Sequence, residues 1–167
     1  MNTPIVYLAG PLGFSEAGRL FHNTVLVPLI KEIGFDIRDP WTLTSTEMID
    51  AVFNLPYGQK KKQAMVEMNQ VIGCNNLMAI KESDLIVAVL DGVDIDSGTA
   101  AEIGCGYALR KMVIGYRGDF RLSSENEGGI VNVQVQYFIE LSGGKIVTSV
   151  ESLKKALVEY KNSFFQP

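Results

Sequence analysis

Residues 84–90 read DLIVAVL, and this run decides the fold. Six consecutive apolar side chains follow Asp84, without the polar and apolar alternation of a strand that has one solvated face. A strand of this kind belongs inside a parallel sheet that helices cover on both faces. A similar run, IVYLA at residues 5–9, stops at Gly10 and Pro11 and indicates the first strand of the same sheet.

Strand-like and helix-like segments alternate along the rest of the chain. This alternation predicts a single domain over residues 1–167 with a doubly wound, flavodoxin-like α/β fold and five parallel strands. The remaining strands are expected at 35–38, 112–116 and 145–148, and the helices at 15–33, 44–81 with a break at 55–58, 98–111 and 149–161.

The composition limits the function. A net charge of -4 argues against nucleic-acid binding, which usually requires a basic face. No apolar run reaches the roughly 20 residues that cross a bilayer, and the N-terminus lacks a signal-peptide pattern, so we expect a cytoplasmic protein without a membrane partner. His22 is the only histidine and the two cysteines are far apart, so no zinc site, and no other metal or cofactor, is expected. Helical periodicity around His22 favours an ordinary packed or exposed side chain.

Ligands of doubly wound folds bind beyond the carboxyl ends of the strands. Residues 91–102, DGVDIDSGTAAE, follow the most apolar strand and place Asp91, Asp94, Asp96 and Glu102 close together. Like charges at such spacing repel one another unless they are solvated or used. Three interpretations remain open from the residues alone: Thr99 and Glu102 form a helix-capping box, the aspartates form turns, or they bind magnesium.

Four separated segments, in order, resemble the nucleoside 2-deoxyribosyltransferase family. They are YLAGP at 7–11, NNLMAI at 75–80, DSGTAAEIG at 96–104 and NVQ at 132–134. The resemblance implies an enzyme that moves 2-deoxyribose between nucleobases through a covalent intermediate on Glu102. It implies that Tyr7 hydrogen-bonds Glu102 and that Asp96 binds the 5′-hydroxyl of the sugar.

The resemblance also implies a homo-oligomer, a dimer or a multiple of dimers, with shared active sites. Asn132, and beside it Gln134, would reach into the site of a neighbouring subunit, and Gly10 and Pro11 would contact the substrate. Small-molecule 2′-deoxynucleosides and free nucleobases are the implied partners. Asn76 stands where well-known bacterial members have Asp, and an amide is no general acid, so base preference and proton delivery are open. Trp41, after the second strand, is either a base-stacking residue or a packed loop aromatic.

Three other functions compete with this interpretation. One is an N-glycoside hydrolase of 2′-deoxynucleosides or their 5′-monophosphates that uses the same nucleophile, although Asp96 would repel a phosphate there. The others are a non-catalytic nucleoside sensor and a metal-dependent phosphoryl-transfer enzyme that uses the aspartates. Residues 117–121, RGDFR, are interpreted as a surface loop, or alternatively as a lid over the site.

Overall fold

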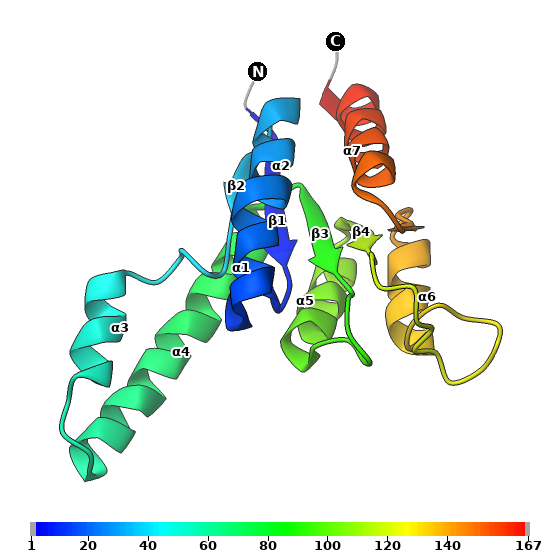
Figure 1. The fold of residues 1–167 in the computed structure, drawn as a ribbon. Coiled ribbons are helices and arrows are strands. Elements are labelled where there is room, and N and C mark those ends of the chain that lie inside the picture. Colours follow the sequence, from blue (N-terminus) through cyan, green and yellow to red (C-terminus); the bar gives the residue numbers. More distant parts are fainter. Residues whose placement is uncertain (1–2, 166–167) are drawn as a thin grey trace.

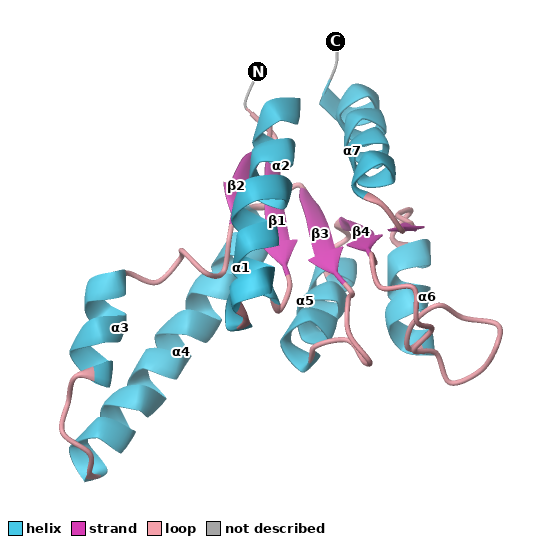
Figure 2. Cartoon of the chain, viewed as in Figure 1, coloured by secondary structure: helices cyan, strands magenta, loops and turns pink. Residues whose placement is uncertain are grey.

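The computed structural model describes residues 3–165 and confirms the predicted fold class. Five parallel strands form one sheet in the order β2-β1-β3-β4-β5, which Figures 1 and 2 show at the centre of the molecule. Val87 of β3 lies opposite both Leu8 of β1 and Ile114 of β4, so the DLIVAVL run supplies the central strand. The strands are β1 Ile5–Ala9, β2 Asp36–Arg38, β3 Leu85–Val89, β4 Met112–Tyr116 and β5 Ile146–Val147.

Helices cover both faces of the sheet and enclose two hydrophobic cores. One core lies under α2 and α7, and the other lies under α4, α5 and α6. All five residues of β3 are buried, which explains the unbroken apolar run in the sequence. The helices are α1 Glu16–Phe21, α2 Val27–Ile33, α3 Thr46–Phe53, α4 Gln59–Glu82, α5 Ser97–Ala108, α6 Val133–Leu141 and α7 Val150–Phe165.

The alternation of side chains along β1 determines which residues reach each core. Val6 and Leu8 pack in the core that includes α2 and α7, whereas Tyr7 and Ala9 pack in the core that includes α5. Successive side chains of a strand point to opposite faces of the sheet, so a shift of one residue would turn Tyr7 away from α5. The register of β1 therefore places a buried tyrosine beneath the helix that follows β3.

The helix expected at residues 15–33 is interrupted. After α1, residues His22–Leu26 form a turn of π-helix (η2) before α2 continues to Ile33. The ends of this segment agree with simple capping rules, because the Ser15 hydroxyl accepts from Gly18 N at 3.0 Å and Gly34 adopts φ 92°. Sequence periodicity alone did not reveal the π turn.

The carboxyl-terminal third contains a helix that the sequence did not suggest. Residues 117–132 form a long loop after β4, seen beside α6 in Figure 2, and α6 then begins because the Asn132 side chain accepts from Gln134 N and Val135 N. The break at 55–58 lies between α3 and α4 as expected, and both helices extend away from the sheet in Figure 1. Within residues 3–165, no helix is long and apolar enough to cross a membrane.

Two glycines give opposite predictions for stability. A Cβ at Gly144 would lie 1.7 Å from the Val113 carbonyl oxygen, whereas a Cβ at Gly73, within α4, would meet nothing within 4 Å. We expect Gly144→Ala to lower the free energy of unfolding by at least about 1–3 kcal/mol because backbone must move. Gly73→Ala should raise it by about 0.5–1 kcal/mol, since alanine favours the helix. Urea unfolding of both variants measures the change in the free energy of unfolding. Equal changes in the two variants would contradict the close packing at Gly144.

Candidate active site

A cavity of about 440 Å³ opens at the carboxyl ends of β1, β2 and β3, between α4 and α5. This is the position that the doubly wound fold predicts for a ligand site. Five of the residues expected to act on or bind a substrate line it: Gly10, Trp41, Asn76, Asp96 and Glu102. Phe14, Pro40, Asn69, Ile72, Gly98 and Thr99 complete the lining.

Glu102 lines this cavity and contacts Tyr7, which is not part of the lining. The Tyr7 hydroxyl donates a hydrogen bond of 2.6 Å to Glu102 Oε1, which is the contact expected between them. Tyr7 is completely buried in the sheet, and Glu102 is half-buried on α5. A hydrogen bond from a buried donor restricts the carboxylate to one position and leaves Oε2 available to a ligand.

Burial shifts the pKa of both groups upward. Burial is the main cause that raises the pKa of Glu102 above its ordinary value of 4.5; the Tyr7 hydrogen bond opposes this rise, and the charge of Asp96 adds to it. The pKa of Tyr7 lies well above its ordinary range, first through burial and then through its hydrogen bond to Glu102. Tyr7 therefore remains protonated and acts as a hydrogen-bond donor, and Glu102 is a carboxylate of increased basicity.

The capping-box interpretation of Thr99 and Glu102 is wrong. The N-cap of α5 is Asp96, whose Oδ2 accepts from Thr99 N at 3.0 Å and from Thr99 Oγ1 at 3.2 Å. Thr99 thus lies one turn inside the helix, and Glu102 points to Tyr7 instead of the helix terminus. Asp96 satisfies the helix end, which frees Glu102 from a structural role and keeps a carboxylate beside it in the cavity.

The magnesium interpretation of the aspartates also lacks support. Asp91 Oδ1 accepts from Asp119 N at 2.9 Å, and Asp94 Oδ1 accepts from Ile95 N at 2.8 Å. Asp91 therefore joins the loop after β3 to the loop after β4, and Asp94 bonds the residue that follows it. Among residues 3–165, no group of three or more His, Cys, Asp or Glu side chains is placed to hold a metal ion.

The opposite wall of the cavity comes from α4 and two aromatic residues. Asn69, Ile72 and Asn76 line it at helical spacing from one face of α4. Phe14 contributes from the short 3-10 helix after β1, and Trp41 from the loop after β2. Asn76 Oδ1 is buried and has no hydrogen-bond partner within the described chain. Such an acceptor favours a donor supplied by a ligand or water. Phe14, Asn69 and Ile72 were not predicted, although the i, i+3, i+7 spacing of Asn69 and Ile72 with Asn76 is visible in the sequence.

Arg117 departs from the surface-loop interpretation of residues 117–121, whereas Gly118, Phe120 and Arg121 are exposed as it expects. Its side chain is 1% exposed, and its guanidinium donates to the carbonyl oxygens of Leu90, Gly92 and Arg121. It therefore joins the loop that leads to Asp96 with the loop that leads to α6. Asp119 and Arg121 form an ion pair nearby, and this pair holds the pKa of Asp119 well below its usual range.

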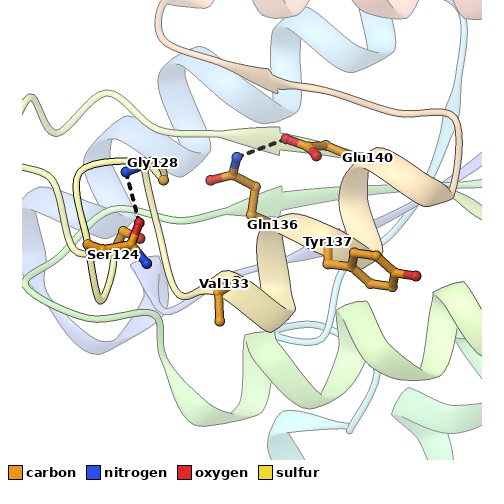
Figure 3. A pocket seen from close by; sticks show the side chains of 8 residues that line it. Ser124, Gly128, Val133, Gln136, Tyr137 and Glu140 are labelled. Atoms are coloured by element: carbon orange, nitrogen blue, oxygen red, sulfur yellow. Dashed lines mark hydrogen bonds between the residues drawn. The ribbon is translucent and has the colours of Figure 1, made fainter.

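Three residues expected at the site lie outside the cavity of their own chain. Pro11 caps the short 3-10 helix η1 (Leu12–Phe14), and Asn132 and Gln134 lie at the start of α6. Next to them, Figure 3 shows a second, smaller cavity of about 150 Å³, lined by Ser124, Val133, Gln136 and other residues of the 117–132 loop and α6. This cavity contains none of the residues proposed to react.

Comparison with known proteins agrees with this geometry. The model of the nucleoside 2-deoxyribosyltransferase family matches residues 6–134, which include β1, the α4 and α5 walls and the Tyr7–Glu102 pair. The chain belongs to the nucleoside 2-deoxyribosyltransferase family. The match covers most of the chain and ends at the start of α6, where Asn132 and Gln134 lie. No curated protein matches the sequence.

Solved structures share the fold over nearly the whole length of this chain. A conserved protein from Enterococcus faecalis V583 is 26% identical, with a TM-score of 0.68 over 95% of this chain and 99% of that one. The 2-deoxyribosyltransferase from Leishmania mexicana is 22% identical, with a TM-score of 0.64 over 98% and 99%. The 2-deoxyribosyltransferase from Bacillus psychrosaccharolyticus is 19% identical, with a TM-score of 0.62 over 90% of each chain.

Glu102→Gln tests the electrostatic description of the site. The raised pKa means that the folded state binds the Glu102 proton more tightly than the unfolded state does, so the ionised carboxylate costs stability above that pKa. We expect Glu102→Gln to unfold at a higher temperature than the wild type at pH 7. The difference should shrink as the pH falls through the pKa of Glu102. Calorimetry from pH 4 to 8 measures this difference in unfolding temperature, with Glu127→Gln, at an exposed position, as the control. If the unfolding temperature depended on pH in the same way in both variants, the raised pKa of Glu102 would be refuted.

Proposed function

We propose that this protein transfers 2-deoxyribose from a 2′-deoxynucleoside to another nucleobase through an ester on Glu102. The observation that carries the proposal is a half-buried carboxylate in a cavity, held by a completely buried tyrosine and not used to cap its helix. A carboxylate held in this way can stabilise an oxocarbenium-like transition state and then bond to the anomeric carbon.

The proposed reaction has two displacements. Glu102 Oε2 attacks C1′ from the face opposite the base, the C1′–N bond breaks, and its electron pair leaves with the base, which takes up a proton. A nitrogen of the second base then attacks C1′ of the ester, loses its proton and releases the Glu102 carboxylate. Two inversions give net retention at C1′. Tyr7 donates to Oε1 throughout and keeps Oε2 directed at the sugar.

Asp96 favours a substrate without a 5′-phosphate. It lines the cavity beside Glu102, and its charge contributes to the raised pKa of Glu102. A hydroxyl can donate to this carboxylate, whereas a phosphate at close range would be repelled by roughly 1 to 4 kcal/mol in a partly solvated site. We therefore propose that Asp96 binds the 5′-hydroxyl and that nucleosides are better substrates than nucleotides.

The base is proposed to lie against the α4 wall, near Asn76, Trp41 and Phe14. The unpaired Asn76 Oδ1 can accept a hydrogen bond from a ring or exocyclic N–H group of the base. An amide does not deliver a proton to the leaving base, so we propose that this proton comes from solvent. Gly10 also lines the cavity, and a Cβ added at Gly10 would lie 2.9 Å from Val89 Cβ.

A second copy of the chain is proposed to complete the site. Gln134 is exposed and Asn132 partly exposed at the start of α6, outside the cavity of their own chain, so they are accessible to a neighbouring subunit. The covalent intermediate must be shielded from water if a base is to outcompete it. Contact between copies in a homo-oligomer supplies this shielding.

The transfer assay tests the proposal directly. One incubation contains a 2′-deoxynucleoside and a different free base without added metal, and chromatography follows the products. We expect a new deoxynucleoside with the wild type, and none with Glu102→Ala or Glu102→Gln. Free base and deoxyribose alone would show a hydrolase of the same mechanism, for which 5′-monophosphates should then be tried. Binding without either product, unchanged in Glu102→Gln, would show a nucleoside sensor and refute the proposal.

Tyr7→Phe separates positioning from attack. The variant keeps the buried ring but loses a charge-assisted hydrogen bond, so kcat should fall by about 10–100-fold. Because this bond lowers the pKa of Glu102, the acid limb of the kcat/KM profile should also move to higher pH. Rate profiles from pH 4 to 8 measure both effects. Tyr107→Phe, a half-buried tyrosine outside the cavity, is the control; an acid limb that stays fixed in Tyr7→Phe would contradict the assignment.

A further inference from the structure

The only histidine of the chain forms a buried hydrogen-bonded pair with Asp39 that the reaction above does not use. His22 Nε2 lies 2.7 Å from Asp39 Oδ2, and the two residues are 5% and 9% exposed. A carboxylate can only accept, so the ring donates from Nε2. A buried carboxylate without such a partner would be strongly destabilising, which makes His22 the compensating group for Asp39. Periodicity predicted an ordinary packed or exposed histidine. In the structure, His22 is buried and donates to Asp39.

Asp39 also hydrogen-bonds within residues 39–42, the loop that lines the cavity. Its second oxygen, Oδ1, accepts from Trp41 N at 3.1 Å, and its carbonyl oxygen accepts from Thr42 N at 2.9 Å and from Thr42 Oγ1 at 3.1 Å. Residues 39–42 therefore form a turn organised by one side chain, and that side chain is fixed from α1 and η2 through His22.

The Trp41 side chain is held from the other side of the cavity. Its Nε1 donates to Gly10 O at 3.2 Å, and its ring is perpendicular to that of Phe14, with ring centroids 4.7 Å apart. A Cβ at Gly13 would lie 2.2–2.4 Å from indole ring atoms, so the indole occupies space that only glycine leaves open. The indole is 38% exposed and lines the same cavity as Glu102.

The histidine begins the single turn of π-helix in this segment, His22–Leu26. Such turns are rare, and they occur frequently at functional sites, where they change the direction in which side chains project. Here the wide turn separates α1, which follows Phe14, from α2, which packs in the core. The irregular helix and the buried pair therefore coincide at one residue.

We propose that the buried His22–Asp39 pair is a positioning device for Trp41, which forms the wall on which the planar nucleobase stacks. This inference rests on the proposed function for the identity of the ligand, and on the hydrogen bonds above for the position of the indole. An aromatic wall of this kind recognises a flat heterocycle by its π-face and tolerates several bases. His22 acts through Asp39 and touches neither the sugar nor the base.

Trp41 is the only tryptophan, so its fluorescence reports on this wall without requiring activity. The variants are His22→Leu, the double variant His22→Leu/Asp39→Leu, and His22→Gln, whose amide can still donate to Asp39. We expect stronger acrylamide quenching and a red-shifted emission in the first two, and wild-type behaviour in His22→Gln. Gly13→Ala is the positive control, because its added Cβ would displace the indole and show the emission of a displaced Trp41.

Titration with adenine or cytosine then measures the binding of a base, with deoxyribose as the control. Each base should quench Trp41 in the wild type, and its Kd should rise by about tenfold in the two leucine variants. In the transfer assay, KM for the base should rise in the same variants while kcat changes little, since Glu102 and Tyr7 are unaffected.

The outcomes separate the two proposals. If His22→Leu does not fold, the double variant decides, because replacing both partners of a buried pair by apolar residues is often tolerated. Wild-type emission and quenching in a folded leucine variant would overturn the positioning role. Free bases that leave Trp41 emission unchanged in the wild type would overturn the stacking wall. Absence of both transfer and hydrolysis in the wild type would overturn the proposed function, while the fluorescence of the variants would still decide the role of His22.

Discussion

The hydrogen bond between Tyr7 and Glu102 is the interaction on which the site depends, and it depends in turn on the register of the sheet. Tyr7 points toward α5 because its neighbours Val6 and Leu8 pack in the core under α2 and α7, on the opposite face of the sheet. Glu102 reaches it because Asp96, and not Glu102, caps the helix. The core, the helix start and the Glu102 carboxylate are therefore a single arrangement, and a change in the strand register would disrupt all of them.

Much of the fold could be predicted because its signals are local and repetitive. The apolar run at 84–90 requires burial on both faces, and the break at 55–58 separates two helices as expected. Helix α6 was missed because its apolar positions follow an irregular loop and its start depends on the Asn132 side chain. The π turn was missed because one extra residue in a turn barely changes the periodicity of a sequence.

Less of the site could be predicted, because its supporting contacts join residues that are distant in the sequence. The resemblance identified Glu102 and Tyr7, but the residues alone favoured a capping box, since Thr99 and Glu102 have the spacing for one. Arg117 was placed in a surface loop because loops at this end of the sheet are commonly polar. Its burial depends on three carbonyl oxygens that no pattern encodes. The partner of His22 lies 17 positions away for the same reason.

The two halves of the cavity are built from different kinds of structure, and this difference has a chemical consequence. On one side, Glu102 belongs to α5, Asp96 caps that helix, and Tyr7 belongs to a central strand, so their geometry is set by the core. On the other side, Asn76 belongs to a face of α4, Phe14 to the short 3-10 helix η1, and Trp41 to the loop after β2. A loop can change its side chains at little cost to the core. The loop residue Trp41 can therefore vary in this architecture while Glu102 and its donor Tyr7 stay fixed by the core.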